Sequence, residues 1–277
     1  MDSSQKPAVP VAGSLMVVGT GIQAVGQLTI EAQSCAGAAD KLFYLASDPV
    51  TERYLQELNP TAESLQTSYA DHKDRFESYL DMIDRIMTQV RRGLNVCVAF
   101  YGHPGVFVYP SHQVIRAARG EGYRARMLPG ISAEDCLFAD VGIDPAIPGC
   151  QSFEATDFLL FRRKFDPHSS LILWQIGLIG DLTFRAGGYE NKYIGVLIEY
   201  LLPFYAPNHP VIIYEASHFS IYDPRMERTV LEQLAERRLT AVSTLYVPPL
   251  EAAAIDKGML DRLGLKPEQL QKVELHV

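Results

Sequence analysis

The sequence is poor in cysteine and in positive charge and has no long hydrophobic run, and each shortage excludes a class of protein. Its 277 residues include four cysteines, none of them in a Cys-x-x-Cys pair, and this usage indicates the reducing cytoplasm. No apolar run reaches the roughly 18 residues that a membrane-spanning helix needs, so no membrane partner is expected. The formal net charge is −8, whereas proteins that bind nucleic acid broadly usually present a basic face. These shortages favour a small-molecule or peptide substrate.

The sequence also lacks the motifs of two kinds of binding site, those for metals and those for dinucleotides. The seven histidines show no metal-ligand spacing with Cys, Asp or Glu, so no metal is expected. The turn Gly19-Thr20-Gly21 lacks the Gly-x-Gly-x-x-Gly spacing of dinucleotide sites, and no acidic residue follows the strand predicted over 41–45. Both observations disfavour an NAD site. Residues 1–13 are polar and carry no long apolar stretch, so we expect a flexible leader there.

The order of predicted elements indicates an α/β fold. A strand at 15–18 runs into a glycine turn, a helix follows over 28–39 and a second strand over 41–45. Apolar periodicity predicts a helix over 74–92 that ends at Gly93. The remaining predicted elements are helices at 51–58, 111–120, 195–204 and 253–263, and strands at 96–100, 124–128, 170–175, 210–216 and 243–247. We expect an N-terminal α/β domain over 14–129, a C-terminal α/β domain over 130–250, and a tail with a short helix over 251–277.

Three glycine-bearing turns each follow a predicted strand or close one. They are GTGIQAVG at 19–26, YGHPG at 101–105 and PGISA at 129–133. In open α/β sheets, ligands bind in the crevice beyond the carboxyl ends of the strands. Glycine lets backbone groups approach a ligand closely, so we expect these turns to line a binding cleft.

The three turns, in this order and spacing, resemble the tetrapyrrole methylase superfamily over nearly the whole of residues 14–249. The resemblance implies two α/β domains with S-adenosylmethionine folded in the cleft between them. Members that modify tetrapyrroles usually carry Gly-Pro-Gly-Asp in the first turn, where this chain has Gly21-Ile22-Gln23-Ala24. They usually carry Gly-Asp-Pro in the second, where this chain has Gly102-His103-Pro104. Both departures disfavour a corrin or sirohaem substrate.

Longer stretches resemble the borosin peptide N-methyltransferases, which methylate backbone amides of a ribosomally made peptide. The stretches are YGHPGVFV at 101–108 and EGYRARMLPGISAEDCLFAD at 121–140, and the Tyr-x5-Arg-x3-Tyr spacing of Tyr69, Arg75 and Tyr79 matches that family's catalytic segment. The resemblance extends to QSFEA at 151–155, LWQ at 173–175 and Ser243-Thr244. It implies S-adenosylmethionine as cofactor, with contacts at Tyr101, His103, Val106, Ala133, Gln175, Ala216, Ser243 and Thr244.

The resemblance also carries expectations about partners. We expect a homodimer that binds two precursor peptides, with the segment near 60–80 of one protomer covering its partner's site. The chain ends at Val277 without an apolar core peptide, so we expect the split bacterial form, whose precursor is a separate chain. A truncated fused enzyme is the competing interpretation.

A peptide N–H is a very weak acid, so N-methylation needs a base or stabilisation of the carbonyl oxygen. Ionising a phenol of pKa ~10 at pH 7 costs ~4 kcal/mol. The Coulomb attraction of an arginine ~4 Å away, at an effective dielectric of ~20, stabilises the phenolate by about the same amount. Arg75 and Tyr79 are four residues apart and share a helix face. We therefore assign Tyr79, tuned by Arg75, as the base, with Tyr69 and Tyr101 binding the amide oxygen and positioning the peptide.

Purely structural roles are alternative interpretations of the same residues. Tyr79 is also explained as a core aromatic, Arg75 as a solvated charge and His103 as a residue that caps a turn. At the level of the whole chain, one alternative is a tetrapyrrole or ribosomal RNA methyltransferase of the same fold. A second is a non-catalytic module that binds the cofactor or a peptide.

Overall fold

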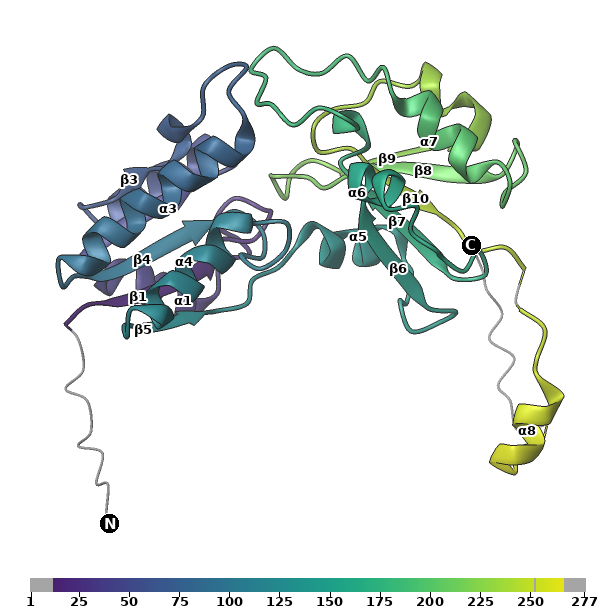
Figure 1. Ribbon diagram of the computed structural model, residues 1–277, viewed down its shortest axis with the longest axis horizontal. Helices are drawn as coiled ribbons and strands as arrows, with labels where there is room; N and C mark the ends of the chain where they lie inside the picture. The colour runs from purple at the N-terminus through teal and green to yellow at the C-terminus, as the bar shows by residue number, and fades with distance from the viewer. Residues whose placement is uncertain (1–11, 252, 267–277) are drawn as a thin grey trace.

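The computed structural model describes residues 12–251 and 253–266. Most of the expected leader and much of the expected tail therefore lie outside the described residues. Figure 1 shows two α/β domains side by side, the first coloured purple to teal and the second teal to yellow-green. Each domain is built on its own five-stranded sheet.

The N-terminal sheet is entirely parallel, with strand order β3-β2-β4-β1-β5. Its strands are β1 (Ser14–Gly19), β2 (Lys41–Leu45), β3 (Glu63–Ser64), β4 (Asn95–Phe100) and β5 (Arg124–Met127). The connecting elements are α1 (Ile30–Ala38), α2 (Pro49–Leu58), the 3-10 helix η1 (Gln66–Ser68), α3 (Arg75–Arg91) and α4 (Tyr109–Gly120). Crossover connections between parallel strands place helices on both faces of such a sheet.

The alternation of side chains along the central strands explains this two-faced packing. On β4, Val96, Val98 and Phe100 pack in one core with α3 and α4. Cys97 and Ala99 point to the opposite face and pack in a second core with α1 and α2. Because both faces are covered, the strand reads as a continuous apolar run in the sequence.

The C-terminal sheet is mixed, with strand order β6-β7-β10-β8-β9. Only β6 and β7 pair in parallel, and the other pairs are antiparallel. Its strands are β6 (Cys150–Glu154), β7 (Ser170–Trp174), β8 (Pro210–Glu215), β9 (Arg225–Val230) and β10 (Thr244–Val247). Helices α6 (Ala155–Leu160) and α7 (Ile194–Leu201), and the 3-10 helix η3 (Leu231–Glu236), pack on one face. Helix α5 (Ala133–Val141) packs on the other.

The structure adds elements to those predicted and shifts some bounds. The sequence did not predict β3, α5, β6, α6 or β9. The tail helix predicted from 253 is α8 (Lys257–Leu263), which begins later because the Asp256 carboxylate caps it by accepting the Met259 N–H at 3.0 Å. The helix predicted over 195–204 ends at Leu201, and residues 202–204 form turns.

The chain passes from the first domain to the second between β5 and α5, and the two domains also contact each other at other places. The Ala24 N–H donates to the His218 carbonyl at 2.8 Å, and the Ser47 hydroxyl lies 3.2 Å from the His218 ring. On another side of the cleft, residues 71–75 pair with a loop of the C-terminal domain, since Asp74 and Thr183 form an antiparallel bridge. These contacts hold the cleft between the domains.

Candidate active site

The three glycine turns meet at the carboxyl edge of the N-terminal sheet. A Cβ on Gly19 would lie 2.3 Å from the Gly102 carbonyl oxygen, and one on Gly130 would lie 2.9 Å from the same atom. Gly21 and Gly102 exchange backbone hydrogen bonds of 2.8 and 3.3 Å. The sequence argument expected these glycines to make room for a ligand. The structure shows that Gly19 and Gly130 make room for the backbone of a neighbouring turn.

A cavity of about 130 Å³ lies beyond this edge, between the two domains. Six of the eight residues expected to contact the cofactor line it: Tyr101, His103, Val106, Ala133, Gln175 and Thr244. The wall also contains apolar residues that were not among the expected cofactor contacts, together with the polar Ser132 and Glu134; the apolar ones are Ile22, Phe107, Val108, Trp174, Ala241 and Val242. The cavity is therefore largely apolar, with a few polar groups placed at its edge.

His103 has a defined orientation in this cavity. Its Nδ1 atom accepts the Gly105 N–H at 2.9 Å, so the neutral ring carries its proton on Nε2. His103 caps its own turn, as the structural interpretation of this residue predicted, and it also lines the cavity. The two roles are compatible, because the capping nitrogen leaves Nε2–H as a donor.

Gln175 lies where three neighbouring cavities meet. It follows β7 and precedes the 3-10 helix η2 (Ile176–Leu178), with backbone angles φ 59° and ψ 37°. Left-handed conformations of residues other than glycine cost energy and concentrate at functional sites. The Ile176 N–H donates to the Ser243 carbonyl at 3.0 Å and fixes the turn. The side chain of Gln175 is thus held at the junction of the cavities.

Ser243 and Ala216 do not line the 130 Å³ cavity. Ser243 is buried, its hydroxyl donates to the Glu215 carboxylate, and it accepts the Thr240 N–H at 2.8 Å. Ala216 packs beside Ala133 and Trp174 against the core of the C-terminal sheet. Their contact with a cofactor stays a prediction, whereas the structural role of Ser243 is evident from its partners.

Replacing Ser243 with alanine should lower stability more than it lowers cofactor affinity. The change leaves the Thr240 N–H without its acceptor, and an unsatisfied buried group costs about 1–3 kcal/mol. Urea unfolding measures the stability, and calorimetry with S-adenosylhomocysteine measures the affinity. A tenfold loss of affinity at unchanged stability would show instead that the hydroxyl contacts the cofactor.

A second group of predicted residues converges beside the first. Tyr69 ends η1, Tyr79 lies on α3, and Tyr101 follows β4. All three, with Gln175, line a cavity of about 70 Å³. The rings of Tyr69 and Tyr79 meet edge to face with centroids 6.4 Å apart. Arg75 lines an adjoining cavity of about 390 Å³, which shares Tyr79 and Gln175 with the tyrosine cavity.

Burial raises the pKa of each of the three phenols, but their other surroundings differ. For Tyr69, the neighbouring phenols Tyr79 and Tyr101 each raise the pKa further, by more than the charge of Arg75 lowers it. For Tyr79, the positive charge of Arg75 and a hydrogen bond from Tyr69 act against burial and lower the pKa. Tyr79 is therefore the phenol whose anion this cluster stabilises, although burial outweighs Arg75 in the protein alone.

Tyr101 differs from the other two phenols in its exposure. Burial of its phenol raises the pKa, although 42% of the residue is exposed. That exposed surface faces the two cavities that Tyr101 lines. Tyr101 is therefore a wall residue that the two cavities share.

The sequence argument missed the aromatic residues that support this cluster. Phe184 stacks on Tyr69 with ring centroids 5.0 Å apart, and Tyr109 stacks on Tyr79 at 6.0 Å. The Arg75 guanidinium donates to the backbone carbonyls of Asp181 and Leu182. The partly exposed Arg75 is therefore held by a loop more than a hundred residues away in the sequence.

Residues 14–235 match the family described as Tetrapyrrole (Corrin/Porphyrin) Methylases. The chain belongs to the tetrapyrrole methylase family. The solved structure of uroporphyrin-III-C-methyltransferase from Thermus thermophilus shares the fold, with a TM-score of 0.61, 17% identity, and coverage of 89% of this chain and 99% of that one. A structure of this bacterial enzyme complexed with S-adenosylhomocysteine gives a TM-score of 0.57 at 18% identity, over 85% and 92% of the two chains.

Curated relatives are much more similar in sequence, and they are borosin-type proteins. The methyltransferase and cyclic peptide omphalotin A precursor of Omphalotus olearius is 45% identical over 260 residues, which is 92% of this chain and 62% of that protein. The type III borosin precursor of Anomoporia bombycina is 42% identical over 257 residues, 91% of this chain and 30% of that protein. The chain thus spans less than two thirds of the length of these relatives.

The part of the chain that the structure describes holds neither a cluster of metal ligands nor a helix suited to crossing a membrane. Among residues 12–251 and 253–266, no three His, Cys, Asp or Glu side chains gather as metal ligands. In the same part of the chain, no helix combines the length and the apolarity that crossing a bilayer demands.

Proposed function

We propose that this protein uses S-adenosylmethionine to methylate backbone amide nitrogens of a ribosomally made precursor peptide. The observation that carries the proposal is the convergence of Tyr69, Tyr79 and Tyr101 on one cavity that adjoins a second, largely apolar cavity. Similarity to methyltransferases that carry their own peptide precursors supports the peptide as substrate. The altered first and second turns argue against a tetrapyrrole.

The residues of the 130 Å³ cavity suit an adenosyl group. Ala133, Val106 and Val242 offer apolar surface at which a flat base packs closely, and His103 Nε2–H and the Gln175 amide offer hydrogen bonds. The cavity and the tyrosine cavity share Tyr101, Phe107, Val108 and Gln175 in their walls. S-adenosylmethionine would supply an electrophilic methyl group on a positively charged sulfur.

The tyrosines then divide the work on the peptide amide. The Tyr79 Oη atom accepts the proton of the amide nitrogen, and Arg75 and the Tyr69 hydroxyl stabilise the phenolate before that step. Tyr101 orients the peptide at the junction of the cavities by donating a hydrogen bond to the amide oxygen. The nitrogen would gain the methyl group as the bond from that methyl to sulfur breaks, which would leave neutral S-adenosylhomocysteine, and the proton stays on Tyr79 until solvent removes it.

The proposal extends to the partners. The precursor reaches the cleft as a separate molecule, and a fused arrangement like that of the relatives is the competing one. We propose a homodimer with two precursors because the exposed side of α3 carries Phe76 and Leu80, which are 50% and 48% exposed. The four cysteines are free thiols, which suits a cytoplasmic protein.

The test is co-expression with the short reading frame adjacent to the gene, followed by mass spectrometry of the peptide. We expect mass increments of one methylene each, which tandem spectra place on backbone nitrogens. Parallel incubations with uroporphyrinogen III and with ribosomal RNA compare the other substrate classes of this fold. An unmodified peptide beside intact protein, with methyl transfer to either alternative, would overturn the proposal. Binding of S-adenosylmethionine without turnover on any substrate would indicate a non-catalytic module.

A further inference from the structure

A loop of the C-terminal domain reaches across the cleft to the proposed catalytic segment. We call residues 180–192 the strap; it connects η2 to α7 and meets residues 69–75 of the N-terminal domain at the top of Figure 1. The His72 N–H donates to the Phe184 carbonyl at 2.8 Å, and the Phe184 N–H donates to the Lys73 carbonyl at 2.9 Å. The Arg75 N–H adds a bond to the Leu182 carbonyl at 3.1 Å. The two segments form a short backbone ladder between domains.

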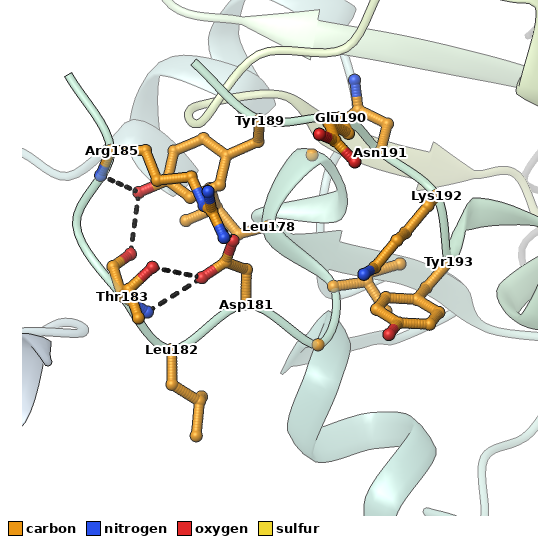
Figure 2. Close-up of a pocket in the computed structure, with 13 residues that line it drawn as sticks. Leu178, Asp181, Leu182, Thr183, Arg185, Tyr189, Glu190, Asn191, Lys192 and Tyr193 are labelled. Carbon is orange, nitrogen blue, oxygen red and sulfur yellow. Dashed lines mark hydrogen bonds and ion pairs between the residues drawn. The ribbon is translucent and has the colours of Figure 1, made fainter. Parts of the chain in front are cut away.

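The strap has its own internal bracing. The Asp181 carboxylate accepts the N–H and the hydroxyl of Thr183 at 2.9 and 2.7 Å and pairs with Arg185 at 2.5 Å. The Tyr189 hydroxyl accepts the Arg185 N–H at 3.2 Å and donates to the Thr183 carbonyl at 3.1 Å (Figure 2). Although burial raises the pKa of Asp181, its bonds from Thr183 and Arg185 bring that pKa to about 2. The bracing is therefore intact at neutral pH.

Two contacts connect this braced loop to the proposed catalytic side chains. The Phe184 ring stacks on Tyr69, with an interplanar angle of 26°. The carbonyls of Asp181 and Leu182 accept the guanidinium of Arg75. Tyr69 and Arg75 are the two groups that favour the Tyr79 anion, so the strap holds both from the opposite domain.

We propose that Phe184 is a positioning residue that fixes the Tyr69 ring against Tyr79, with the strap carbonyls fixing Arg75 in the same way. This positioning role rests on the proposed function, in which Tyr79 is the base. Without the ring of Phe184, Tyr69 is free to turn away from Tyr79. Misplacement of a catalytic group by about 1 Å can cost about 100-fold in rate.

The test compares three variants of the strap. In Phe184→Ala the ring is lost, in Phe184→Tyr it is kept, and Gly187→Ala changes the same loop at a position where an added Cβ meets no atom within 4 Å. We expect Phe184→Ala to lower kcat for the precursor at least tenfold, with the KM for S-adenosylmethionine and the unfolding midpoint nearly unchanged. Phe184→Tyr and Gly187→Ala should keep kcat close to that of the unaltered protein.

A second measurement separates this proposal from the proposed function. Hydrogen exchange at residues 69–76 reports the strap contact whether or not any peptide is methylated. Phe184→Ala should speed exchange there, and Phe184→Tyr should not. If the unaltered protein methylates no peptide, the proposed function fails and the exchange result alone decides whether the strap holds the segment. Unchanged kcat or unchanged exchange in Phe184→Ala, or equal losses in all three variants, would overturn the positioning role.

Discussion

Tyr79→Phe is expected to remove methyl transfer to the precursor almost completely while leaving cofactor affinity intact. The change deletes the one phenol whose anion is favoured both by Arg75 and by the Tyr69 hydroxyl. General bases contribute roughly 100- to 10,000-fold to rate, and we expect a loss near the upper end because no other phenol of the cluster is favoured as an anion by both a cation and a hydrogen bond. Single-turnover mass spectrometry measures the rate, and calorimetry with S-adenosylhomocysteine measures the affinity.

Tyr222→Phe is the matched control, because it removes one phenolic hydroxyl from a residue that is 65% exposed and lines neither cavity. It should turn over at the normal rate. Turnover of Tyr79→Phe within a few-fold of the control would refute the base assignment and turn attention to Tyr69 or Tyr101.

Gly19→Ala should destabilise the N-terminal domain by about 3 kcal/mol, at the upper end of what overpacking costs. The added methyl group would lie 2.3 Å from the Gly102 carbonyl oxygen and 2.8 Å from Pro104 Cδ. Backbone cannot retreat as a flexible side chain does, so the three turns must separate. The same shift should weaken S-adenosylhomocysteine binding, because Gly102 and its neighbours line the cavity.

Gly120→Ala provides the comparison for this change. It adds the same methyl group at the end of α4, where nothing lies within 4 Å. Urea unfolding of both variants should show a loss for Gly19→Ala alone. Equal stability of the two would mean that the turns are not packed as tightly as the distances indicate.

The N-terminal half of the fold was more readable from sequence than the C-terminal half. Strands β1, β2 and β4 are buried on both faces, so they appear as apolar runs between glycine turns. Strands β6 (CQSFE) and β9 (RMERTV) lie at the edges of the mixed sheet and carry polar side chains at exposed positions, which hides them. Helix α5 did have a signal, the capping box of Ser132 and Asp135, that the sequence argument left unused.

The candidate site was readable where side chains themselves carry the pattern. Spacing and resemblance singled out the tyrosines, and the structure brings Tyr69, Tyr79 and Tyr101 to one cavity. The strap was not readable, because its main contacts are backbone hydrogen bonds between residues more than a hundred positions apart. Such bonds leave no trace in residue identity, and Phe184 in an irregular loop shows no periodicity.

The mutual packing of the three glycine turns limits how this protein can acquire new substrates. Because Gly19 and Gly130 both pack against the Gly102 carbonyl, no side chain can be introduced at Gly19 or Gly130 without displacing a neighbouring turn. Space for variation is greater on the wall that α3 and the strap supply. A directed-evolution library for new peptides should therefore randomise positions of that wall other than Arg75, Tyr79 and Phe184, and keep Gly19 and Gly130 constant.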